Sequence, residues 1–315
     1  MMSGVKPKVA ILGVTGMVGN SIYQTLQDRC DLLLVYRNKE KLNLLDQRHG
    51  EVNQHTTYLL DLDIVYREYL KNSAKGTLLS PTLTKLVNEL STCDWVINAL
   101  AIITPYCEID PGLTFFINSA FPHLLAEILG SKLIHIATDC VFNGSIGAPY
   151  DEMAPKLPAD VYGLSKALGE PPKALVIRTS FIGLELTGNR SLLGWLISEK
   201  GKTVNGYTNH WWNGITALEF GHVCQKIINR EVTPEPGVYH IFSEDITKHD
   251  LLVKLNQKFN LNCKINLVAA PVAIDRRLRT IKDLNQQLQI PSLSCMMEEL
   301  NDFSAVVSNK SPVKA

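Results

Sequence analysis

VAILGVTGMVG, residues 9–19, is a short apolar run that leads into three glycines spaced three residues apart. The run predicts a buried strand, and the apolar spacing from residue 18 to residue 26 predicts a helix directly after it. Gly13 and Gly16 allow a tight turn and a close approach to a pyrophosphate, while Gly19 allows close packing of helix and strand. Glycine turns also serve plain structure, but the strand before and the helix after favour dinucleotide binding.

Beyond this stretch, short β-rich apolar runs alternate with helical patterns. The runs cover residues 8–12, 32–36, 58–60, 95–100, 133–137 and 174–177. Apolar residues at positions i, i+3 and i+4 lie between them, for example in residues 18–26 and 115–129. This alternation predicts an α/β fold, a Rossmann-type doubly wound parallel sheet with helices on both faces.

The regular alternation of strand and helix patterns ends after residue 178, which predicts a smaller interleaved C-terminal substrate lobe. We expect an NAD(P)-binding Rossmann domain over residues 1–180, with segments near 215–243 returning to it. The lobe is expected at residues 181–214 and 244–303, and a flexible polar tail at 304–315.

The composition excludes some classes of partner. Lys plus Arg and Asp plus Glu both number 31, so no net charge draws the chain to nucleic acid or to an anionic membrane. The longest apolar run is far below the roughly 20 residues of a membrane span. Seven scattered cysteines without a C-x-x-C pair indicate reduced thiols and a cytoplasmic location, and the histidines show no metal spacing.

The second predicted strand ends in Arg37, where an NAD-specific site would place an acidic residue. A guanidinium pairs well with a 2′-phosphate, so NADP (as NADPH) is favoured over NAD, although Arg37 could be a plain surface residue. Asp61 could contact the adenine or cap a helix. The other candidate cofactor-binding residues are Thr15, Met17, Val18, Leu62, Asn98, Ala99 and Leu100.

Tyr162 and Lys166 are four residues apart, which places both on one face of a helix. A phenol is a poor acid near neutral pH, and a nearby ammonium lowers its pKa. Such pairs occur by chance, but this one follows the fifth predicted strand, which ends in Thr138. Polar residues at the carboxyl end of a parallel strand stand where such sheets bind ligands, so Thr138 is expected to hold a substrate oxygen beside the phenol.

Four motifs resemble the dTDP-4-dehydrorhamnose reductase family of extended short-chain dehydrogenase/reductases. They are TDCVFNG at 138–144, PYDE at 149–152, VYGLSKALGE at 161–170 and RTS at 178–180; VINA at 96–99 and GVYH at 237–240 also fit. The resemblance implies transfer of a hydride from a nicotinamide to carbon 4 of a nucleotide-linked 4-keto-6-deoxy sugar. It also implies that Thr138, Tyr162 and Lys166 are catalytic, that Gly13, Gly16 and Gly19 line the pyrophosphate, and that Asn98 and Ala99 lie along the cofactor.

Departures from the family pattern keep alternatives open. Cys140 replaces the usual tyrosine, and Phe181 replaces a frequent tryptophan. Epimerase-reductases similar to GDP-fucose synthase place a catalytic cysteine like Cys140, although residues 181–199 lack the second acid they need. Sugar dehydratases expect a glutamate at position 140. The regulatory subunit of methionine adenosyltransferase resembles the same reductases and acts by binding a partner.

The remaining candidates concern the substrate and the assembly. We expect a nucleotide-sugar substrate and a possible homodimer. Three arginines at 276, 277 and 279 could clamp a diphosphate or form a solvated turn. The candidate substrate-binding residues are Asp139, Cys140, Asn118 and Arg178.

Overall fold

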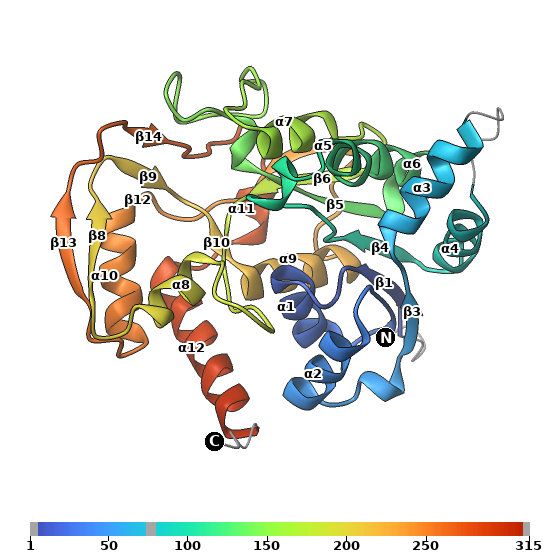
Figure 1. Cartoon of the computed structure of the whole chain (residues 1–315), viewed down its shortest axis with the longest axis horizontal. Coiled ribbons are helices and arrows are strands. Elements are labelled where there is room, and N and C mark those ends of the chain that lie inside the picture. Colours follow the sequence, from blue (N-terminus) through green and yellow to red (C-terminus); the bar gives the residue numbers. More distant parts are fainter. Residues whose placement is uncertain (1–5, 74–79, 311–315) are drawn as a thin grey trace.

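A computed structural model describes residues 6–73 and 80–310 and contains one large parallel sheet (Figure 1). The strand order is β11-β6-β5-β4-β1-β2-β3, and every neighbouring pair is parallel. The order reverses between β1 and β4, which creates the crevice where such sheets bind ligands. The predicted doubly wound sheet is therefore confirmed. Its strands are β1 (Lys8–Leu12), β2 (Asp31–Tyr36), β3 (Thr56–Leu59), β4 (Trp95–Asn98), β5 (Leu133–Thr138), β6 (Leu175–Thr179) and β11 (Gly237–His240).

Alternating residues of β1 bury opposite faces of this sheet. Val9 and Ile11 belong to one core, whereas Ala10 and Leu12 belong to the other. Each fully buried aliphatic side chain contributes about 1.5–3 kcal/mol, so both layers stabilise the sheet. The first core is covered by α1 (Met17–Leu26), α2 (Lys39–His49), α9 (Ala217–Ile228) and α12 (Leu293–Lys310). The second is covered by α3 (Leu62–Ser73), α4 (Pro81–Ser91), α6 (Phe121–Leu129) and the π-helical turn η3 (Phe116–Ala120) that follows α5 (Pro111–Phe115).

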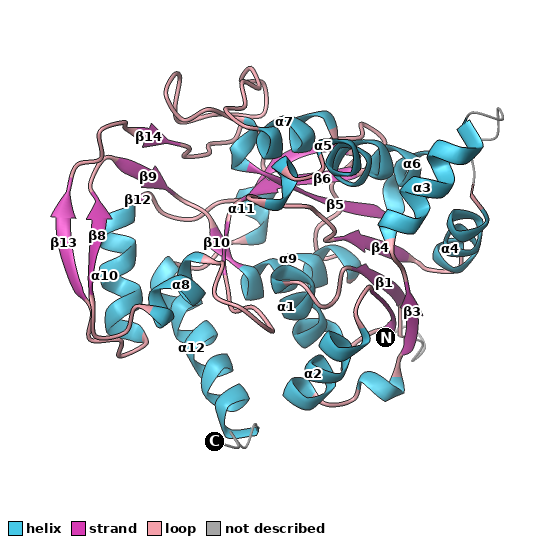
Figure 2. Cartoon of the chain, viewed as in Figure 1, coloured by secondary structure: helices cyan, strands magenta, loops and turns pink. Residues whose placement is uncertain are grey.

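A second group of elements lies beside the sheet, on the left of Figure 2. Three small sheets form it, with orders β10-β7, β12-β9-β14 and β13-β8. Their strands are β7 (Phe181–Ile182), β8 (Thr203–Tyr207), β9 (His210–Trp212), β10 (Ile215–Thr216), β12 (Ile246–Thr247), β13 (Lys264–Val268) and β14 (Ile274–Asp275). The associated helices are α8 (Leu192–Ser198), α10 (Lys248–Lys258) and α11 (Leu284–Leu288).

The chain passes between the two groups more than once. After β10 it returns as α9, which packs along α1, and then as β11, which pairs with β6. It leaves the large sheet again for β12, α10 and β13. The division of labour between a cofactor-binding part and a substrate-binding lobe stays a prediction.

The C-terminal segment differs from the expected tail at 304–315. Helix α12 continues to Lys310, and residues 311–315 lie outside the described part. No glycine or proline interrupts the sequence between residues 293 and 310, so the helix propagates through the polar stretch once its first turns pack in the core.

One helical segment of the described chain, residues 111–132, is long and apolar enough by composition to cross a membrane, with a mean hydropathy of 1.2. Half of it is buried within the protein. Phe121, Leu125 and Leu129 pack in the second core, so contact with the sheet explains the apolar character of this segment.

Candidate active site

The glycine turn between β1 and α1 has the geometry that a dinucleotide site needs. Gly13 has a φ of +82°, and a Cβ on Gly19 would overlap the carbonyl of Gly13, so both positions require glycine. Gly16 is the N-cap of α1 and offers no side chain to the first turn, which holds no acidic residue. The free N–H groups of that turn can therefore receive an anion such as a pyrophosphate.

The rim of this turn carries the predicted nucleotide contacts. Arg37 is exposed just beyond β2, and within residues 6–73 and 80–310 it has no ion-pair partner. Asp61 accepts a hydrogen bond from the N–H of Asp63 at 3.0 Å. Its carboxylate thus caps the start of α3, which was one of the two roles expected of it.

Behind the crevice, a buried polar network joins β4, β5 and α7 (Val161–Leu168). The Asn98 amide oxygen accepts from the N–H of Leu100 at 3.2 Å, so its NH₂ group faces Nδ1 of His135 at 3.1 Å. His135 is neutral because burial holds its pKa well below the usual range. Its Nδ1 therefore accepts from Asn98, and its Nε2 lies 3.5 Å from Nζ of Lys166, whose charge further lowers the pKa of His135.

Lys166 is buried, and its Nζ donates to the carbonyl of Ile136 at 2.6 Å. Burial lowers the pKa of Lys166 to about 8. The sequence argument missed His135 as a partner of this lysine. The available signal was a single polar residue in the otherwise apolar strand that runs into Thr138.

The structure brings Thr138 and Tyr162 together at the carboxyl end of β5. Gly163 makes the approach possible, because a Cβ there would overlap the carbonyl of Cys140. Burial and the neighbouring Cys140 raise the pKa of Tyr162, and the hydroxyl of Thr138 works in the opposite direction. A phenol in this setting keeps its proton and can donate it to an oxyanion.

Asp139 and Cys140 lie in the turn η5 (Asp139–Val141) beside this pair. Thr138 donates to the Asp139 carboxylate at 3.2 Å and accepts from the N–H of Cys140 at 3.2 Å. Burial and the carboxyl of Asp139 raise the pKa of the Cys140 thiol to about 12. Cys140 is thus a neutral thiol near pH 7, which argues against a role as a catalytic base.

Two residues expected to bind substrate have their polar groups taken up by the fold. The Asn118 amide is fully buried and exchanges two 2.8 Å hydrogen bonds with the backbone of Ile102 while donating to Ser165. Arg178 is buried and pairs with both carboxylate oxygens of Glu170, at 2.7 and 2.8 Å. Both side chains therefore have structural partners within the fold, and their role as substrate contacts stays a prediction.

The resemblance implies ketone reduction at this site, and we expect Cys140→Ser to leave that activity within about threefold of wild type, because a neutral thiol contributes no proton transfer. Solvent deuterium should not enter the sugar product at the carbon beside the ketone with either protein. Mass spectrometry of the product checks this, and deuterium uptake that disappears in the variant would instead identify Cys140 as an epimerisation base.

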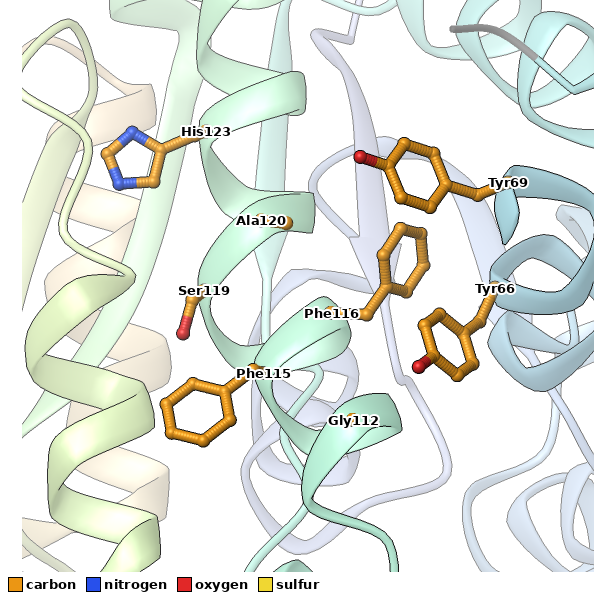
Figure 3. Close-up of a pocket in the computed structure, with 8 residues that line it drawn as sticks. All are labelled: Tyr66, Tyr69, Gly112, Phe115, Phe116, Ser119, Ala120 and His123. Carbon is orange, nitrogen blue, oxygen red and sulfur yellow. The ribbon is translucent and has the colours of Figure 1, made fainter. Parts of the chain in front are cut away.

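A separate apolar depression of about 410 Å³ lies between α3 and the segment from α5 to α6. Figure 3 shows Phe116 packed between Tyr66 and Tyr69, with Phe115 on the other side of its helix. None of the predicted catalytic or cofactor residues lines it.

Comparison with known proteins places the chain in a family. Residues 7–296 match the family model described as "RmlD substrate binding domain". The chain belongs to this family. The expected resemblance to extended short-chain dehydrogenase/reductases is therefore confirmed at the family level.

Several proteins similar to this chain are named reductases. The chain is 31% identical over 170 residues to a dTDP-4-dehydrorhamnose reductase of Aggregatibacter actinomycetemcomitans, covering 47% of this chain and 55% of that protein. It is 26% identical over 206 residues to the Salmonella typhimurium reductase, covering 61% and 67%. The structure of the Bacillus anthracis reductase in complex with NADP has a TM-score of 0.68 at 20% identity, covering 94% and 99%.

Proposed function

We propose that this protein reduces the 4-keto group of a nucleotide-linked 4-keto-6-deoxy sugar with NADPH, in the cytoplasm. The observation that carries the proposal is the position of Thr138 beside Tyr162 at the end of β5, with Lys166 one helical turn further along α7. The named activity of the Aggregatibacter and Salmonella relatives supports the choice of substrate class.

The residues around the crevice fit a dinucleotide. A Cβ added at Gly16 would lie 3.3 Å from the carbonyl oxygen of Gly13, a tight contact, so glycine suits the turn where a pyrophosphate would approach. The uncapped first turn of α1 would hold the phosphates, and Arg37 would pair with a 2′-phosphate. NADPH, when bound, supplies the hydride.

The chain's own residues then supply orientation and the proton. Thr138 and Tyr162 hold the ketone oxygen, and the phenol donates its proton as the oxyanion forms, which yields the alcohol. Lys166, one helical turn after Tyr162 on α7, would bind the nicotinamide ribose and stabilise the phenolate that remains. Solvent water then reprotonates Tyr162.

The direct test is to incubate the purified protein with NADPH and dTDP-4-keto-6-deoxyhexoses prepared enzymatically. Loss of NADPH absorbance with formation of a dTDP-6-deoxyhexose supports the proposal. Tight NADPH binding without consumption of any keto sugar contradicts it and favours a non-catalytic, partner-binding role.

We expect Arg37→Ala to weaken NADPH binding about tenfold to a hundredfold, since a charge-assisted pair is worth about 1.5–3 kcal/mol. NADH binding should be unchanged, because NADH lacks the 2′-phosphate. Fluorescence titration of both cofactors measures this. Arg29→Ala is a matched control, since Arg29 is exposed at the opposite end of β2. Equal losses for NADPH and NADH would contradict the assignment of Arg37.

A further inference from the structure

The three arginines that follow β14 differ sharply in their partners. Arg277 pairs with Asp245 and Asp275, both at 2.7 Å, and Arg279 pairs with Asp151 at 3.0 Å. Arg276 has no carboxylate within ion-pair distance among the described residues. Two of these arginines therefore form ion pairs within the fold, and Arg276 forms none.

Arg276 points toward the end of β5. Its Nε donates to the carbonyl of Phe142 at 3.1 Å, and its Nη1 lies 3.5 Å from Sγ of Cys140. A guanidinium has five N–H donors. Because only two atoms of Arg276 are engaged, donors on both terminal nitrogens remain for a ligand.

The backbone at Gly144 holds Arg276 in this position. Gly144 has a φ of +79°, and its carbonyl accepts from the N–H of Asp275 at 2.7 Å. A Cβ on Gly144 would lie 2.8 Å from Cγ2 of Ile274 and 3.0 Å from Cγ of Arg276. The glycine therefore lets β14 cross directly over the loop after β5, and the stem of Arg276 rests on that loop.

The groups next to the guanidinium are those expected to hold the ketone. Cys140, which Arg276 contacts, is close enough to Tyr162 to influence its ionisation, and Thr138 is two residues before Cys140. A ketone oxygen bound by Thr138 and Tyr162 would thus place its neighbouring ring carbon toward Arg276. Of the two ring carbons beside the ketone of a 4-keto-6-deoxy sugar, carbon 3 carries a hydroxyl and carbon 5 a methyl group, so only carbon 3 offers a hydrogen-bond acceptor.

We propose that Arg276 donates a hydrogen bond to the hydroxyl on carbon 3, beside the ketone, and so selects sugars that carry this hydroxyl over 3-deoxy sugars. The inference rests on the proposed function and extends it to substrate choice. The buried carboxyl of Asp139 lies nearby and balances the charge of Arg276, which favours a neutral hydroxyl over a carboxylate as the acceptor.

The test compares two probes, a dTDP-4-keto-6-deoxyhexose and the matching dTDP-4-keto-3,6-dideoxyhexose. Wild type should prefer the first in kcat/KM by about 10-fold to 100-fold, the worth of one hydrogen bond to a charged group. Arg276→Met should lose most of this preference by slowing the hydroxylated sugar alone. Its kcat/KM for the 3-deoxy sugar and its affinity for NADPH should stay within about threefold of wild type.

Two further variants separate specificity from structural damage. Arg279→Met removes a neighbouring arginine that is tied to Asp151, and it should leave the preference intact. Gly144→Ala should displace Arg276 and reduce the preference. The inference would be overturned if Arg276→Met lost kcat/KM equally on both sugars, or if wild type showed no preference between them. A wild-type preference for a 4-keto sugar that bears a carboxylate would also overturn it. A wild type that reduces neither sugar would overturn the proposed function itself.

Discussion

Replacing Tyr162 with phenylalanine is expected to lower turnover by about two to four orders of magnitude while NADPH affinity stays unchanged. The substitution keeps the aromatic ring but removes the proton that the developing oxyanion needs. Stopped-flow or steady-state loss of NADPH absorbance measures turnover, and fluorescence titration measures binding.

Tyr150→Phe is the matched control for this experiment. Tyr150 stacks on Phe142 with ring centroids 4.2 Å apart, and its hydroxyl donates to the carbonyl of Ile146 at 2.6 Å. Loss of that hydroxyl removes one structural hydrogen bond near the site, so activity should remain within about threefold. Near wild-type turnover in Tyr162→Phe would refute the role of the phenol as proton donor.

Lys166→Met is expected to lower kcat/KM by about two orders of magnitude or more and to weaken NADPH binding about tenfold. The ammonium is needed for both the ribose and the phenolate. Because burial lowers the pKa of Lys166 to about 8, the ammonium is present below that pH and is lost above it. Wild-type kcat/KM should therefore fall as pH rises through about 8, since this parameter reports ionisation of the free enzyme.

The residual activity of Lys166→Met should not change between about pH 7 and 9, because the titrating group is gone. Lys173→Met is the control, since Lys173 is an exposed lysine paired with Glu127 at the surface. A variant that keeps the wild-type pH profile would show that another group controls it. The group that controls the pH profile would then have to be a different ionisable residue.

The parts of the fold that the sequence predicted are those with local causes. The glycine turn needs Gly13 and Gly19 for reasons confined to one strand and one helix, and the alternation of strands and helices reflects period and composition. The spacing of Tyr162 and Lys166 on α7 is equally local. The end of β5 was placed correctly because polar residues abruptly follow an apolar run.

The parts that were missed depend on contacts between distant segments. Arg178 stands at the end of a strand, and only the structure shows that it pairs with Glu170. Asn118 hydrogen-bonds to the backbone of Ile102, in the loop after β4, and residue spacing alone does not reveal this contact. The sequence alone does not distinguish the three arginines after β14. Their roles differ because β14 crosses the chain at Gly144, more than a hundred residues earlier.

The return of α9 to α1 and of β11 to β6 has a consequence for how the protein is made. Until residue 240 has left the ribosome, β6 is an open edge strand and α1 lacks the helix that packs along it. The part of the large sheet formed by residues before 180 therefore cannot complete its packing ahead of the rest during synthesis. A fragment that stops near residue 180 would expose both an unpaired edge and an apolar helix face, which are the features that drive chains to aggregate. The residues before and after position 180 therefore have to be expressed and engineered together.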